Sequence, residues 1–102
     1  MSAGPLTLVE ALHQRLQVVQ EISSAQSRNL LNRHLGGGAE FEIERIEQEI
    51  ALTGSSHALA KALEDARERL KKANSVMAEC DAHCAMLERR LDELDGWIAA
   101  SS

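Results

Sequence analysis

The most regular stretch of this chain spans residues 59–98 and reads LAKALEDARERLKKANSVMAECDAHCAMLERRLDELDGWI. Its apolar residues recur at alternating intervals of three and four, which is the heptad pattern (positions a to g) of a coiled-coil helix with apolar a and d positions. We take Leu63 as an a position. The predicted oligomer seam then consists of Leu59, Leu63, Ala66, Leu70, Ala73, Met77, Cys80, Cys84, Leu87, Leu91, Leu94 and Ile98.

The residues before this stretch predict where its helix begins. Gly54 stops a preceding helix, and Ser55 or Ser56 can cap the next one by accepting a hydrogen bond from its first turn. The stretch contains no Pro, and its first Gly is Gly96. We therefore expect a long coiled-coil helix over residues 56–100, about 67 Å long at 1.5 Å per residue.

A shorter helix is predicted over residues 39–53. Its acidic first turn suits a helix N-terminus, and Ile43, Ile46 and Ile50 form an apolar stripe. This stripe is displaced by one residue from the heptad frame of the long helix, so a straight rod would rotate the stripe at Gly54. A turn at Gly54 that makes an antiparallel hairpin is the preferred interpretation, and a kinked continuous helix is the alternative.

The first helix is predicted over residues 7–35. Thr7 and Glu10 match a capping box, and the apolar positions with helical spacing are Val9, Leu12, Leu16, Val19 and Ile22. Gly36 supplies the left-handed residue that commonly ends a helix. The run Gly36–Gly38 is then a flexible joint, either natural or an engineered linker.

These elements predict an all-α fold, an elongated helical hairpin or coiled-coil bundle with one long C-terminal heptad helix, in a single domain over residues 1–102. A compact domain of this length has a radius of gyration of only about 13 Å, which is too small for the long helix. The stripe from Met77 to Ile98 needs either the first helix or a second chain to cover it. We therefore expect self-association or a helical partner.

Composition excludes several other classes of protein. The chain has 11 basic and 16 acidic residues, a net charge of −5, and 2% aromatic residues. The acidic balance argues against nucleic-acid binding, and no apolar run is long enough for membrane insertion. The N-terminus lacks the features of a secretory signal, so a cytoplasmic location is expected.

The residues Cys80, His83 and Cys84 form the one constellation with metal-ligand types. Two thiolates one helical turn apart could bind a soft metal, with His83 adjoining, or serve a redox role. The preferred interpretation is that both Cys residues are small seam residues, because free Cys is often buried, so no metal and no cofactor is expected. Trp97 is interpreted first as a rim contact of the self-association seam. The alternative is a partner anchor, since Trp is enriched at binding hot spots.

The tail from Leu87 to Ile98 reads LERRLDELDGWI. It resembles the helical stalk end of tumour-susceptibility-type ESCRT-I subunits, in which a Leu-Asp-x-Trp-like ending follows a coiled coil. The resemblance covers about a tenth of the chain. It implies a stalk subunit of a vesicle-sorting or tethering complex that pairs with unlike helical chains.

The sequence also bears on enzymatic activity. It has no nucleophile-elbow pattern and no phosphate-loop Lys-Ser/Thr after its three glycines. The leading hypothesis is a non-enzymatic coiled-coil scaffold or assembly module that oligomerises through its helices, with itself or other helical proteins as partners. The alternatives are the stalk subunit and a metal or redox helical bundle that uses Cys80 and Cys84.

Overall fold

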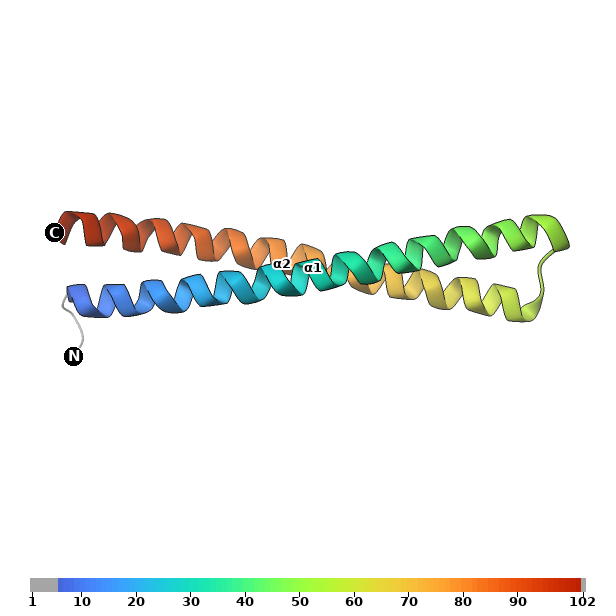
Figure 1. Cartoon of the computed structure of the whole chain (residues 1–102), viewed down its shortest axis with the longest axis horizontal. Helices are drawn as coiled ribbons and strands as arrows, with labels where there is room; N and C mark the ends of the chain where they lie inside the picture. The colour runs from blue at the N-terminus through green and yellow to red at the C-terminus, as the bar shows by residue number, and fades with distance from the viewer. Residues whose placement is uncertain (1–5, 102) are drawn as a thin grey trace.

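The fold is an antiparallel hairpin of two long helices. The computed structural model describes residues 6–101, which form α1 (Leu8–Thr53) and α2 (His57–Ser101). The helices pack side by side into a rod of 70 × 25 × 14 Å, with the start of α1 and the end of α2 at one end of the rod and the turn at the other (Figure 1). The predicted all-α elongated hairpin is confirmed.

Local signals in the sequence place the helix ends. The Thr7 hydroxyl accepts a hydrogen bond from the Glu10 amide at 3.1 Å, and the Glu10 carboxylate accepts one from the Thr7 amide at 3.4 Å, which completes the predicted capping box. Gly54 ends α1 with a φ of 84°, a conformation that favours glycine. The Ser56 hydroxyl then accepts from the Leu59 amide at 3.1 Å and caps α2.

The predicted break at Gly36–Gly38 is wrong, because α1 runs through all three glycines without interruption. The separate helices expected over residues 7–35 and 39–53 are one helix, and among the described residues only Gly54 has a positive φ. Gly36 is buried against α2. A Cβ atom on Gly36 would lie 3.5 Å from the Cβ of Ala73 and 3.7 Å from a methyl carbon of Leu70. A small residue therefore lets the two helices approach each other at this point.

A continuous heptad pattern explains why α1 stays helical through Gly36, Gly37 and Gly38. Two series of residues, each with a spacing of seven, supply most of the face of α1 that packs against α2. All of their members are buried or half-buried: Arg15, Ile22, Asn29, Gly36, Ile43 and Ile50 at one position, and Ala11, Val18, Ala25, Asn32, Ala39 and Ile46 at the other. Packing along this face stabilises the helix despite the low helix propensity of glycine.

The core between the helices is uneven along the rod. Near the chain ends, Ala11, Val18, Leu87 and Leu94 form a buried cluster, with Leu6, Ile22, Leu91 and Ile98 packed around it. Toward the turn, Ile46 is fully buried. Between these two regions the buried residues are small, namely Ala25, Gly36, Ala39, Ala73 and Cys80.

Candidate functional site

The predicted seam of α2 faces α1 of the same chain. Its d positions, Ala66, Ala73, Cys80, Leu87 and Leu94, are buried. The remaining seam residues are half-buried: Leu59, Leu63, Leu70, Met77, Cys84, Leu91 and Ile98. These residues therefore hold the hairpin together, and whether a second chain also contacts them stays a prediction.

The structure decides between the two covers that the sequence leaves open for the C-terminal part of the seam. The stripe from Met77 to Ile98 was expected to lack cover unless the first helix or a second chain supplied it. Because α1 is one helix of 46 residues, about 69 Å long at 1.5 Å per residue, its N-terminal part covers that stripe within the chain. A case for assembly must therefore rest on surfaces that the hairpin leaves exposed.

The first such surface lies on α1 near the free end of the rod. Val9, Leu12, Leu16 and Val19, which we call the outer stripe, are exposed, with 75% of Val9 and 55% of Leu16 accessible. The sequence pattern predicted these residues as the apolar stripe of the first helix, but of that set only Ile22 packs against the seam cluster. The inward face of α1 carries Arg15 and Asn29, so apolar periodicity alone identified the outer face.

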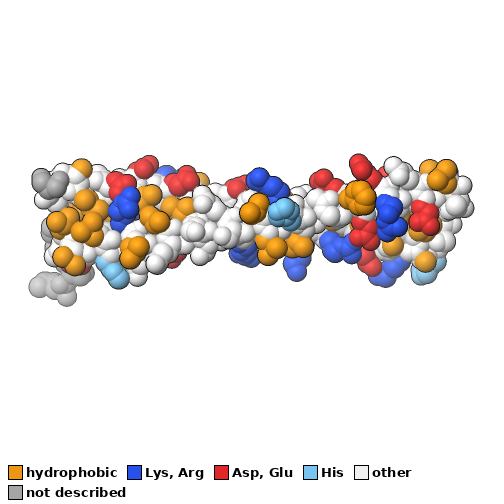
Figure 2. Space-filling view, viewed as in Figure 1, with side chains coloured by type: hydrophobic (Ala, Val, Ile, Leu, Met, Phe, Trp, Pro, Cys, Tyr) orange, Lys and Arg blue, Asp and Glu red, His pale blue; other side chains and the backbone are white. Residues whose placement is uncertain are grey.

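Other large apolar side chains are also exposed on the rod, singly or in pairs. In the view of Figure 2, hydrophobic side chains gather over the half of the rod that carries the chain ends, and fewer lie near the middle. Apart from the outer stripe, the exposed large apolar residues are Leu8, Leu30, Leu31, Leu35, Phe41, Leu52, Met86 and Trp97.

Polar contacts between the helices line both flanks of the seam. On one flank Arg15 pairs with Asp95 at 2.6 Å, and Arg67 pairs with Glu47 at 3.8 Å. On the other flank Arg69 pairs with Glu42. Because these ion pairs are exposed, each contributes at most about 1 kcal/mol. Their main effect is to fix the alignment of the two helices.

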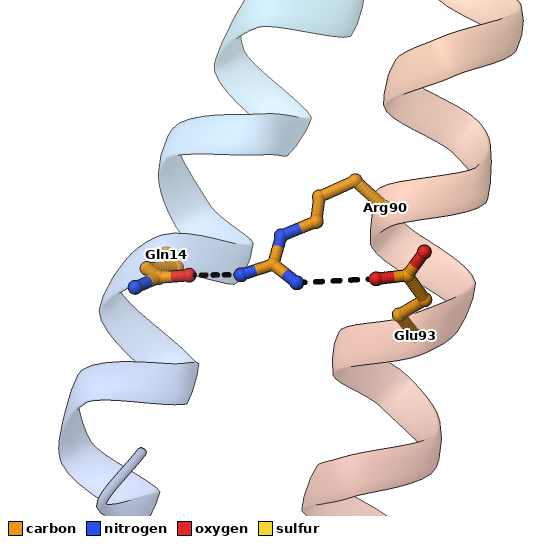
Figure 3. A network of polar contacts seen from close by, with 3 residues as sticks. All are labelled: Gln14, Arg90 and Glu93. Carbon is orange, nitrogen blue, oxygen red and sulfur yellow. Dashed lines mark hydrogen bonds and ion pairs between the residues drawn. The ribbon is translucent and has the colours of Figure 1, made fainter. Parts of the chain in front are cut away.

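A small network on the second flank links the helices near the chain ends (Figure 3). Arg90 donates one hydrogen bond to the Gln14 side chain at 2.6 Å and another to Glu93 at 3.2 Å. The sequence reasoning missed this network and the ion pairs between the helices. They follow from the antiparallel alignment, which sequence spacing within one helix does not supply.

The two thiols lie in the middle of the rod and line different grooves. Buried Cys80 lines an open groove of about 720 Å³ together with His83 and Arg28. Half-buried Cys84 lines a smaller groove of about 380 Å³ on another side. Burial raises the pKa of the Cys84 thiol, and Glu88, Cys80 and Asp81 raise it further. A raised pKa keeps this thiol protonated and less reactive at neutral pH.

The positions of these residues bear on whether Cys80, His83 and Cys84 could bind one metal ion together. Within residues 6–101 no group of three or more His, Cys, Asp or Glu side chains is placed to hold a metal ion. His83 joins Cys80 in one groove, whereas Cys84 lines the other. The three candidate ligands predicted from the sequence therefore do not share one groove.

Trp97, predicted as a rim contact or a partner anchor, lies near the C-terminal end of α2 with 36% of its surface exposed. Its backbone carbonyl accepts a hydrogen bond from the Ser101 hydroxyl at 2.9 Å. The indole is thus partly available at the free end of the rod. Its role as an anchor stays a prediction.

Comparisons with family models, with curated proteins and with solved structures found no match to this chain. Among the described residues, neither helix has a segment that is both long and apolar enough to cross a membrane. The functional argument therefore rests on the residues and contacts of the hairpin itself.

Proposed function

We propose that this chain is a non-enzymatic helical assembly module that associates with further copies of itself through the outside of its hairpin. The observation that carries the proposal is the outer stripe, because α2 packs against the neighbouring face of α1 and leaves these four large side chains exposed to water. A cluster of exposed apolar side chains on a folded protein is typical of an interaction surface.

The shape of the molecule supports the same proposal. Two helices can bury the faces that meet, but each still exposes its outer side, and further helices are needed to enclose both. Completely burying one Leu or Val side chain is worth about 1.5–3 kcal/mol. Covering several half-exposed residues at once therefore offers a substantial driving force for adding helices to the rod.

Light scattering coupled to size-exclusion chromatography tests this function over a range of about 10 to 500 µM. We expect the mass to rise above that of one 11.2 kDa chain as the concentration increases. A mass of one chain across the whole range, with a helical circular dichroism spectrum, would contradict self-assembly. The stalk-subunit hypothesis, in which unlike helices take the same surface, would then be the stronger one.

A further inference from the structure

The outer stripe has a symmetry that bears on what binds it. Its residues are separated by intervals of three, four and three, and their types run Val, Leu, Leu, Val. Spacing and residue type therefore read the same in both directions from the midpoint at Gln14. A two-fold interface between identical chains requires a surface that is complementary to itself, and this stripe meets that requirement.

We propose that the outer stripe binds the outer stripe of a second copy of this chain, with the two α1 helices antiparallel about a two-fold axis near residue 14. This inference rests on the proposed self-association and names its surface. Val9 then packs against Val19 of the second copy, and Leu12 packs against Leu16. Alternating intervals of three and four keep these residues on one side of a helix, as in a coiled-coil seam.

The residues beside the outer stripe are compatible with such a contact. On the flank next to α2, Arg15 forms an ion pair with Asp95 at 2.6 Å. The charge of Arg15 is therefore neutralised within each copy before the two copies meet. The outer flank carries His13 and Gln20, which have no negative charge. The residues at these three positions of α1 therefore bring no unpaired like charges together when two copies approach.

The residues beyond the stripe favour the antiparallel arrangement over a parallel one. Along the same side of α1, the heptad positions toward the turn are occupied by Glu40, Glu44 and Glu47. In a parallel pair each of these carboxylates would face its own copy, and like charges directly opposite one another are destabilising. In the antiparallel pair they extend beyond the end of the second molecule.

The antiparallel arrangement has a characteristic length. The polar residues Ser23 and Gln26 follow Val19 on this side of α1, so the apolar overlap is short and lies at the free end of each rod. Two rods of 70 Å that overlap by about 20 Å give a dimer about 120 Å long. A side-by-side dimer would keep the length of one rod.

The first test compares two matched exposed leucines. Leu16→Glu places a charge in the proposed contact, whereas Leu35→Glu alters a residue of nearly equal exposure, 55% against 57%, on the opposite side of α1. Because both side chains are exposed, both variants should keep the helical circular dichroism spectrum. We expect Leu16→Glu to weaken dimerisation about tenfold or more and Leu35→Glu to leave it within about twofold.

The second test exchanges charges across the axis. In the antiparallel pairing, Leu12→Lys on one chain meets Leu16→Glu on the other, so the double variant L12K/L16E should dimerise better than either single variant. The control L12E/L16E should remain monomeric, because like charges then meet at both positions. In a parallel pairing each position meets itself, and L12K/L16E would show no recovery.

Small-angle X-ray scattering on the dimer gives the third measurement. A maximum dimension near 120 Å supports the end-to-end arrangement, whereas a dimer that keeps the 70 Å length of one rod would overturn it. Oligomers that survive Leu16→Glu unchanged would also overturn this inference while leaving the proposed assembly function intact. A wild-type chain that stays monomeric would contradict both.

Discussion

Glycine has opposite consequences at two positions of this hairpin. Gly37 lies inside α1 with ordinary helical geometry, and a Cβ atom there would have no neighbour within 4 Å. Gly54 ends the helix with a φ of 84°, which L-residues with a Cβ adopt only with strain. The same substitution should therefore change stability in opposite directions at the two sites.

We expect Gly37→Ala to raise the free energy of unfolding by about 1 kcal/mol, because alanine is the better helix former. Gly54→Ala should lower it by about 1 kcal/mol or more, since the left-handed conformation becomes strained. Urea denaturation followed by circular dichroism measures both changes. A loss of stability for Gly37→Ala would show that α1 needs a flexible joint at the glycines after all.

Asn29 shows how a single polar residue can act inside the seam. Its side-chain amide donates to the backbone carbonyl of Met77 at 3.3 Å and to the carboxylate of Asp81 at 3.0 Å. A polar residue at an a position of a coiled coil specifies the alignment of the helices at some cost in stability. Asn29 thus helps to select the observed alignment of the helices in the middle of the rod, where few large apolar side chains are buried.

At the scale of the helix, the unbroken α1 has a direct spectroscopic consequence. Spin labels at Gln20 and Gln48, which share one exposed heptad position, should lie about 42 Å apart with a narrow distance distribution, because 28 residues of helix separate them. Double electron–electron resonance measures this distance in a chain whose native Cys residues are replaced by alanine.

The control pair lies in the other helix. Lys61 and Arg89 in α2 are exposed, occupy the same heptad position as each other and are also 28 residues apart, with no glycine between them. Both pairs should give the same mean distance and a similar width. A shorter or much broader distribution for the α1 pair alone would mean that the helix bends at Gly36–Gly38.

The two helices differ in how far their sequences predict their structure. In α2 every a and d position is apolar or a thiol, so the frame and the inward face follow from spacing, and Gly54 and Ser56 place the start of the helix. The seam of α1 instead contains Arg15, Asn29, Asn32 and Gly36. Arg15 and Asn29 find polar partners on α2, Asp95 and Asp81, whereas Gly36 lies against apolar side chains. Such partnership between distant segments is not visible in local periodicity.

The candidate surface could be predicted only in part. The sequence predicts that the residues of the outer stripe are apolar positions with helical spacing, but it does not show which way they face. Their outward position depends on which face of α1 meets α2, and that is decided by the alignment of the whole hairpin. The ion pairs between the helices, such as that of Arg15 with Asp95, likewise join residues far apart in the chain.

At the scale of the whole molecule, the middle of the rod should open most easily. Large buried side chains lie toward the two ends, where Leu94 and Ile46 are fully buried. In the central seam the buried residues are small, and large side chains such as Met77 are only half-buried. Small buried side chains remove less apolar surface from water, so they contribute less to local stability.

Hydrogen exchange measured by mass spectrometry tests this difference. We expect backbone amides of residues 25–36 to exchange faster than those of residues 39–50, after correction for the intrinsic rates of the two sequences. The two segments have equal length and belong to the same helix, so each serves as a reference for the other. Equal protection would indicate that the hairpin opens as one cooperative unit.

The turn at Gly54 brings the two described ends of the chain together at the far end of the rod (Figure 1). Mechanical load applied between those ends therefore acts across the helix pair and separates one layer of side chains at a time, as in unzipping. Load applied between either end and the turn acts along the helix axes instead and strains many backbone hydrogen bonds together. The rod should therefore unfold at a low force when it is pulled at its paired ends, and resist a higher force when the load acts along its length.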